Sequence, residues 1–295
     1  MFEGIITPIV TPFHRDDQQS INYEATEKLI NHLIEKGVKG IFILGSNGEF
    51  HVMSYQEKVD FAKEVVRMVN KRVPVFAGTG CCSTAETIAL SKEMEVIGVD
   101  ALSIITPYFL KPKDEEIYEH FKEVAEHVNL PIILYNIPKA TGCNITPEIA
   151  ERLADIENIK GIKDSSGNED NLKAYCAISK KKDFSVLIGS DSKISFGYAL
   201  GATGAVAGTS NAITDVVVGL DNALHTGDTQ TAEKLQKDID VIRGVLPLGT
   251  VPSVMKRAVE LAGIAEVGPA RKPVRECTKE DDVKIKEMLA YYHLA

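Results

Sequence analysis

The sequence predicts an α/β fold, a (β/α)8 TIM barrel followed by a C-terminal helical appendage. Eight short apolar runs alternate with segments in which apolar residues recur at helical spacing, and most connections between them are short. The runs are continuously apolar, which is typical of parallel strands buried on both faces. An open, doubly wound sheet is the alternative, but no G-x-G-x-x-G follows the first strand. The pattern therefore favours the closed barrel.

Each expected element has its own local signal. A Ser-x-x-Glu capping box at Ser54 and Glu57 opens the second helix, and Thr146-Pro147 opens another with a capping residue and a first-turn proline. The strands are expected at 4–13, 39–44, 73–78, 100–105, 131–136, within 158–168, at 184–188 and at 204–207. The helices between them are expected at 21–36, 54–69, 83–97, 114–128, from 146 onward, at 171–179 and at 194–200.

The chain continues beyond the eighth strand–helix unit. A chain of 295 residues suffices for one large α/β barrel domain. Three further helical segments, at 228–246, 253–261 and 279–292, are more than the barrel itself uses. We therefore divide the chain into a catalytic barrel, residues 1–225, and a C-terminal helical extension, residues 226–295, which we expect to pack on the outside of the barrel.

The composition argues against several classes of protein. A formal charge of −9 disfavours binding to nucleic acid, and no apolar run approaches the roughly 18 residues of a membrane-spanning helix. Five cysteines form no disulfide framework, and neither they nor the histidines show metal-ligand spacing; His120 and His127 are expected on the surface of one helix. The first residues lack the basic segment and cleavage site of an export signal. We therefore expect a cytoplasmic protein with no metal, membrane or nucleic-acid partner.

Polar residues follow five of the expected strands. Because the active sites of such barrels lie at the C-terminal ends of the strands, these residues should share one rim. Each segment alone could be a turn, a helix cap or a core ring, but five coincidences on one rim favour a functional site. The segments are Gly45-Ser46-Asn47-Gly48-Glu49, Tyr135-Asn136-Ile137-Pro138, Lys163-Asp164-Ser165-Ser166, Gly189-Ser190-Asp191-Ser192 and Gly208-Thr209-Ser210-Asn211.

Lys163 carries the strongest chemical implication. A buried lysine loses hydration of its ammonium form, so its pKa falls, and the neutral amine can attack a carbonyl carbon to form a Schiff base. The alternative is a strand-end lysine that reaches into solvent, since lysine is almost never fully buried. A phosphate-binding barrel isomerase is a second alternative, because Gly189-Ser190 and Gly208-Thr209 follow strands seven and eight. That alternative leaves Lys163 and Tyr135 without a role.

Three motifs together resemble the pyruvate-dependent class I aldolases, the family that includes dihydrodipicolinate synthase, N-acetylneuraminate lyase and 2-keto-3-deoxy sugar-acid aldolases. The motifs are GSNGE at 45–49, YNIP at 135–138 and GIKDSSG at 161–167, and the resemblance covers nearly the whole chain. It implies a covalent imine between Lys163 and pyruvate, with no other cofactor, and proton transfer by Tyr135. It also implies that Ser46 and Asn47, with Gly48 in the same loop, hold the pyruvate carboxylate. A homotetramer built from tight dimers is the implied assembly.

The same resemblance bears on the second substrate. In the synthase branch an arginine that binds the aldehyde's carboxylate follows YN-x-P by two residues; here Ala140 stands at that position, beside Lys139. Phe109 stands where the synthases carry a second tyrosine, and Asp191-Ser192 replaces the Asp-Glu of the sialic acid lyases. These departures leave the keto-deoxy sugar-acid branch as the most similar.

The resemblance therefore implies a lyase that reversibly cleaves a 2-keto-3-deoxy sugar acid to pyruvate and an aldehyde. We expect Lys163, Tyr135 and Ser46 to be catalytic. The aldehyde's hydroxyls are expected to bind Ser165, Asp191, Thr209 and Ser210. Within the family, the alternative is 4-hydroxy-tetrahydrodipicolinate synthase, which condenses pyruvate with aspartate semialdehyde. Outside it, the alternatives are the phosphate-binding isomerase and a non-catalytic barrel that senses a keto acid.

Overall fold

The computed structural model describes residues 2–294, and its centre is a closed barrel of parallel strands. Each strand pairs with the next in sequence, and the last pairs with the first through Gly4 opposite Gly204 and Ile6 opposite Val206. The predicted barrel is confirmed. The strands are β1 (Gly4–Pro8), β2 (Gly40–Ile43), β3 (Val75–Gly78), β4 (Ala101–Ile105), β5 (Ile132–Asn136), β6 (Ile159–Asp164), β7 (Ser185–Ile188) and β8 (Gly204–Val206).

The first strand is shorter than the sequence predicted. Pro8 and Pro12 have no N–H to donate to a strand ladder, so the sheet ends at Pro8. Residues 9–13 nevertheless stay buried, with Phe13 forming an isolated antiparallel bridge to Ile21. This segment contributes apolar packing without extending the sheet.

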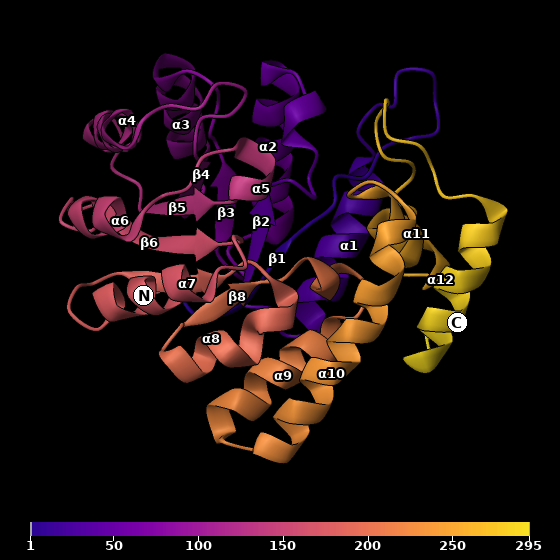
Figure 1. The fold of residues 1–295 in the computed structure, drawn as a ribbon. Helices are drawn as coiled ribbons and strands as arrows, with labels where there is room; N and C mark the ends of the chain where they lie inside the picture. The colour runs from indigo at the N-terminus through magenta and orange to yellow at the C-terminus, as the bar shows by residue number, and fades with distance from the viewer. Residues whose placement is uncertain (1, 295) are drawn as a thin grey trace.

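Helices surround the barrel (Figure 1). The capping box at Ser54 forms as expected, because the Ser54 hydroxyl accepts from the Glu57 N–H and the Glu57 carboxylate accepts from the Ser54 N–H. The helices of the barrel are α1 (Tyr23–Glu35), α2 (Tyr55–Val69), α3 (Thr84–Ile97), α4 (Asp114–Glu126), the short α5 (Pro138–Thr141), α6 (Pro147–Leu153), α7 (Glu169–Ser179), α8 (Ile194–Leu200) and α9 (Thr214–Thr226). Short 3-10 turns follow β2, β7 and β8: η1 (Phe50–Val52), η2 (Asp191–Lys193) and η3 (Gly208–Asn211).

The C-terminal extension forms α10 (Thr229–Val245), the turn η4 (Leu246–Leu248), α11 (Ser253–Leu261) and α12 (Lys279–Tyr291). Arg257 of α11 forms a bidentate pair with Asp282 of α12, at 2.7 and 2.5 Å, which joins the two helices. In Figure 1, β5 and β6 run toward the side on which α10 and α11 lie. The extension therefore lies at the C-terminal ends of the strands.

Apolar packing occurs in two layers. The inside of the barrel is filled by a small cluster, Ile6, Phe42, Phe76, Ala101, Ile133, Leu187 and Val206, and a larger cluster fills the space between strands and helices. Lys163 and Asp164 lie on opposite faces of β6, as strand alternation predicts. The Lys163 amine lies 5.0 Å from the centre of the Phe42 ring inside the barrel, whereas Asp164 accepts a hydrogen bond from Asn136.

His120 corrects one expectation. We expected a surface residue, but His120 is 5% exposed and packs between α4 and α3, where its Nδ1 lies 2.9 Å from the Thr84 hydroxyl. Burial lowers the pKa of His120 to about 4. The sequence spacing indicates this burial, because His120 follows Ile117 by three residues and precedes Val124 by four. Residues at these spacings share one face of a helix, and both Ile117 and Val124 are buried. His127, in contrast, is exposed as expected.

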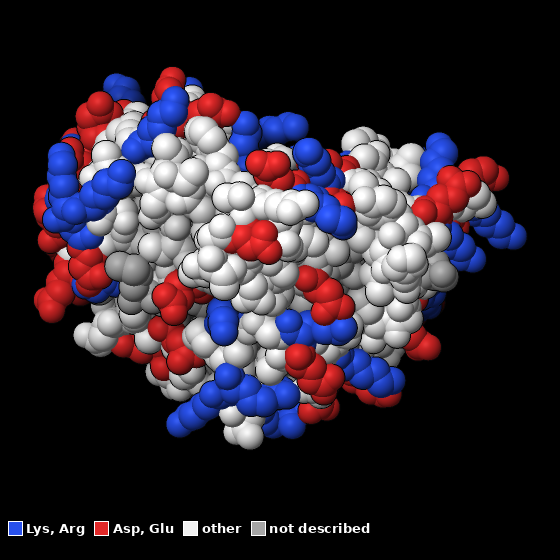
Figure 2. Space-filling model, turned by 90° about the horizontal axis from the view of Figure 1, so that it is seen from below, with Lys and Arg blue, Asp and Glu red and all other residues white. Residues whose placement is uncertain are grey.

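The surface carries both signs of charge. Figure 2 shows the side formed by α8, α9 and α10, where basic and acidic side chains are interspersed. None of the helices within residues 2–294 is long and apolar enough to cross a membrane, and the same residues contain no group of three His, Cys, Asp or Glu side chains placed to hold a metal ion.

Candidate active site

A pocket of about 390 Å³ opens at the C-terminal ends of the strands. Closing eight strands into a barrel brings together residues that are far apart in the sequence, such as Ser46 and Thr209, which are 163 positions apart. Seven of the predicted site residues line it: Ser46, Asn47, Tyr135, Lys163, Ser165, Asp191 and Thr209.

Lys163 lies at the inner end of this pocket. Its side chain is buried, with 4% of the residue exposed, and its amine lies 3.9 Å from the centre of the Tyr135 ring. Strand pairing sets this contact, since Lys163 of β6 is directly opposite Tyr135 of β5. The alternative of a lysine that reaches into solvent is therefore wrong.

Tyr135 connects Lys163 to the loop that follows β2. Its hydroxyl lies 3.5 Å from the Ser46 hydroxyl. Burial alone would raise the pKa of Tyr135, but the charge of Lys163 and polar contacts with Ser46 and Ser165 outweigh it, so the pKa falls below its usual value. A phenol with a lowered pKa can give up and regain a proton more readily, which suits a group that transfers protons.

Gly189 has no side chain, and this absence makes room for Lys163 and Ser165. A Cβ at position 189 would lie 2.0 Å from the Ser165 hydroxyl and 3.1 Å from Cε of Lys163. Any side chain there would displace the Ser165 hydroxyl and crowd the Lys163 side chain. The sequence placed Gly189 on the rim but gave no sign of this packing role.

The 44–49 loop is held in an unusual backbone conformation. Leu44 and Glu49 both have positive φ, 57° and 58°, a region that non-glycine residues rarely adopt. Gly48 stays within the turn, since its backbone oxygen accepts from the Thr11 hydroxyl at 2.7 Å. Contacts with surrounding residues must offset the conformational free energy of this strained backbone.

Glu49 supplies those contacts through the C-terminal extension. Its carboxylate forms a 2.8 Å ion pair with Lys256 of α11 and accepts the Arg271 N–H at 2.7 Å. Both side chains of the pair are buried, at 1% and 2% exposure. Burial lowers the pKa of Lys256 to about 8, and the negative charge of Glu49 opposes this shift. The extension therefore fixes the loop that carries Ser46 and Asn47.

Asp191 and Thr209 join the ends of β7 and β8. The Thr209 N–H donates to the Asp191 carboxylate at 2.8 Å, and Gln236 of α10 donates to the Asp191 backbone oxygen at 3.0 Å. The Thr209 hydroxyl is buried and has no hydrogen-bond partner within residues 2–294. These contacts fix one wall of the pocket next to Asn47, which lies close to Gly208.

Two predicted binding residues do not line the pocket. The Ser210 hydroxyl donates to the Ala207 oxygen at 2.6 Å and lies 2.8 Å from the Thr7 hydroxyl, so it is engaged in holding β8 against β1. Gly48 shapes its turn instead, because a Cβ there would lie 3.1 Å from the Leu44 nitrogen. The structure therefore gives these two residues packing and turn contacts, and their contact with substrate stays a prediction.

The C-terminal extension supplies one wall of the pocket, which sequence reasoning missed. We expected the extension to pack on the outside of the barrel, yet the segment from α10 to α11 also covers its open end. The wall is mostly apolar and includes Leu246, Val251, Pro252, Val254 and Met255, with Arg243 beside them. These residues carry no motif, and only the folded chain brings them to the site.

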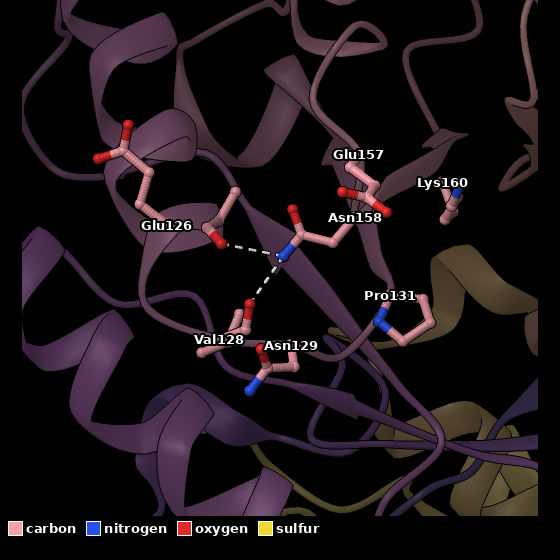
Figure 3. A pocket seen from close by; sticks show the side chains of 8 residues that line it. Glu126, Val128, Asn129, Pro131, Glu157, Asn158 and Lys160 are labelled. Carbon is pink, nitrogen blue, oxygen red and sulfur yellow. Dashed lines mark hydrogen bonds between the residues drawn. The ribbon is translucent and has the colours of Figure 1, made fainter.

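A second hollow lies at the opposite end of the barrel, before β5 and β6 (Figure 3). Glu126, Glu157 and Lys160 lie around it, and the Asn158 amide donates to the Ala125 and Val128 oxygens at 3.0 and 2.9 Å. Asn158 thus anchors the chain between α4 and β5. Because barrel active sites lie at the C-terminal ends of the strands, we assign the hollow in Figure 3 a structural role.

Comparisons with known proteins agree with this geometry. Residues 1–291 match the model of the Dihydrodipicolinate synthetase family. The chain belongs to this family. It is therefore a class I aldolase-type enzyme that acts through a lysine Schiff base.

Members of the dihydrodipicolinate synthetase family resemble this chain over almost its full length. The 4-hydroxy-tetrahydrodipicolinate synthase of Archaeoglobus fulgidus is 38% identical, over 98% of this chain and 98% of that protein. The crystal structure of a Bacillus anthracis dihydrodipicolinate synthase has a TM-score of 0.92 at 35% identity, with 98% of each chain covered. A prophage protein of the family from Escherichia coli K12, solved in complex with pyruvate, has a TM-score of 0.94 at 32% identity, with 100% of each chain covered.

Proposed function

We propose that Lys163 forms an imine with the ketone carbon of pyruvate and that the resulting enamine is joined to, or released from, an aldehyde. The observation that carries this proposal is the buried Lys163 amine, placed beside Tyr135 in the pocket at the barrel's C-terminal end. The pyruvate complex of the related prophage protein supports pyruvate as the first substrate. No cofactor beyond the imine is needed.

The proposed steps use groups already in place. The neutral Lys163 amine attacks the ketone carbon, and the oxygen leaves as water after protonation, which leaves an imine. Tyr135, having given its proton to the departing oxygen, takes a proton from the methyl carbon, and an enamine forms. That carbon attacks the aldehyde carbon, while Tyr135 donates a proton to the aldehyde oxygen. We assign the pyruvate carboxylate to Ser46 and Asn47, and this assignment is supported by their place in the lining of the pocket.

The observations disagree about which aldehyde is the second substrate. The names of the relatives support condensation with aspartate semialdehyde better than the sugar-acid cleavage that the sequence predicted. Ala140 and Phe109 still favour a sugar-acid aldehyde, because the first lacks a guanidinium and the second lacks a hydroxyl. We therefore propose condensation of pyruvate with aspartate semialdehyde as the main activity and cleavage of a 2-keto-3-deoxy sugar acid as the second candidate.

A comparison of specificity constants tests this choice. The main proposal predicts that the wild type has a higher kcat/KM for aspartate semialdehyde condensation than for cleavage of keto-deoxy sugar acids. A preference for the sugar acids would overturn the main proposal and establish the second. The same ratio in Ala140→Arg shows whether position 140 contributes to the choice.

Tyr135→Phe should still form the pyruvate adduct but turn over about a hundredfold more slowly, the usual effect of losing a positioned proton-transfer group. The measurement is kcat together with the thermal midpoint, beside Tyr55→Phe on the surface of α2 as a control. A purely structural role for Tyr135 predicts a lower midpoint and an unchanged rate. Unchanged kcat in Tyr135→Phe would rule out the proposed transfer.

We also propose that the chain assembles as a homotetramer of tight dimers and acts in the cytoplasm. Phe109 and Leu110, after β4, are 93% and 74% exposed, and Phe109 has a positive φ of 78°. Two adjacent exposed apolar side chains on a strained loop suit a contact with a second copy. Sedimentation of the wild type and of Phe109→Asp tests the assembly, since loss of the dimer contact should lower the mass.

A further inference from the structure

The ionisable side chains of the pocket give it a positive character. Besides the Tyr135 phenol, four ionisable side chains line it: Lys163, Lys139, Asp191 and Arg243. Three are basic residues and one is acidic, although the chain as a whole has 42 acidic and 33 basic side chains. Lys163 is assigned to pyruvate, so Lys139 and Arg243 remain without a role.

Arg243 has hydrogen-bond donors to spare. It lies in the last turn of α10, its side chain is 37% exposed, and its nearest carboxylate among the described residues, that of Asp240, is 4.0 Å from Nε. A solvent-exposed pair at that distance binds weakly.

Two other arginines of the extension, Arg257 and Arg271, are engaged in ion pairs. Arg257 pairs with Asp282 at 2.5 Å. Arg271 pairs with Glu57, also at 2.5 Å, and donates to the Gln19 and Val52 backbone oxygens. Arg271 is therefore occupied in fastening the extension to the barrel, whereas Arg243 lines the pocket with its guanidinium uncommitted.

We propose that Arg243, with Lys139 as a second cation, binds a carboxylate at the end of the acceptor aldehyde remote from its carbonyl carbon. The inference rests on the proposed imine at Lys163, which fixes pyruvate at the inner end of the pocket. A guanidinium can bind a carboxylate through two parallel hydrogen bonds, and a lysine adds a point charge. Arg243 thereby supplies from α10 the group that Ala140 does not supply from the turn after β5.

The proposal makes Arg243 the residue that selects the acceptor of the main proposed function. The acceptor is the semialdehyde of a dicarboxylic acid, such as aspartate semialdehyde, and not a neutral sugar aldehyde. The apolar wall formed by Leu246, Val254 and Met255 packs against the carbon chain between the two ends. A neutral aldehyde would leave Arg243 without a partner in this wall.

The test compares acceptors that differ in their far end: aspartate semialdehyde and succinate semialdehyde carry a carboxylate, glyceraldehyde is neutral, and glyceraldehyde 3-phosphate carries a phosphate. Arg243→Gln should lower kcat/KM for both semialdehydes about ten- to a hundredfold, the loss expected for one charge-assisted hydrogen bond, and leave glyceraldehyde unchanged. Arg243→Lys should restore part of the loss. Arg67→Gln, which removes an exposed arginine paired with Glu64 on α2, is the matched control and should change nothing.

Borohydride trapping of pyruvate on each variant separates the two proposals. An intact adduct with an unchanged ratio of semialdehyde to glyceraldehyde in Arg243→Gln overturns the role of Arg243 and leaves the imine chemistry standing. An effect confined to the phosphorylated aldehyde also overturns the carboxylate assignment. Absence of the adduct from the wild type would instead overturn the proposed function itself.

Discussion

Lys163→Arg is expected to fold normally and to show no detectable turnover. Arginine keeps the positive charge and much of the length of lysine, but a guanidinium stays protonated in proteins and cannot become the attacking amine. A cationic side chain at position 163 would keep its aromatic surroundings, because the Lys163 amine lies 3.9 Å from the centre of the Tyr135 ring and 5.0 Å from the centre of the Phe42 ring. The loss should therefore be in the chemistry and not in the fold.

The measurement is the mass of peptides after borohydride reduction in the presence of pyruvate. The wild type should carry one pyruvate-derived adduct, on Lys163, and Lys163→Arg should carry none. Lys160→Arg is the matched control, because it changes a lysine of the same strand that pairs with Asp183 at the surface. An adduct on another lysine, or turnover by Lys163→Arg, would contradict the mechanism.

Lys256→Met is expected to lower the free energy of unfolding by about 3 to 5 kcal/mol, the usual cost of removing one partner of a buried ion pair. Glu49 would remain buried with its charge unpaired, and Glu49 itself sits at a positive φ that these contacts maintain. The 44–49 loop should then relax, so the KM for pyruvate should rise as well. Stability and pyruvate binding are expected to fall together.

A double-mutant cycle tests this coupling. Urea denaturation of the wild type, Glu49→Gln, Lys256→Met and the double variant should show the double variant more stable than the sum of the single effects predicts. Lys28→Met breaks the exposed pair with Glu24 and should change the free energy of unfolding by less than about 1 kcal/mol. Additive effects at Glu49 and Lys256 would show that the pair does not hold the loop.

The sequence alone determined the barrel and placed Lys163 and Asp164 on opposite faces of one strand. Continuous apolar runs, capping residues and strand alternation are local properties, so they can be read without knowing what the chain packs against. The same holds for the rim, because a barrel places the ends of all its strands on one face. Ser46, Tyr135 and Lys163 could therefore be assigned to one pocket, because each lies at or just after the C-terminal end of a strand.

Only the tertiary structure decided which rim residues reach the pocket and what closes it. Ser210 and Thr209 are neighbours in sequence, yet Ser210 bonds to Thr7 across the β8–β1 junction while Thr209 lines the pocket. Lys256 is 207 residues from Glu49, and Arg243 comes from a helix that the sequence placed outside the barrel. Contacts of this kind arise only when distant segments of the chain pack together. The local sequence pattern around each partner reflects its own helix or turn. A pairing across 207 residues therefore leaves no periodicity in the sequence.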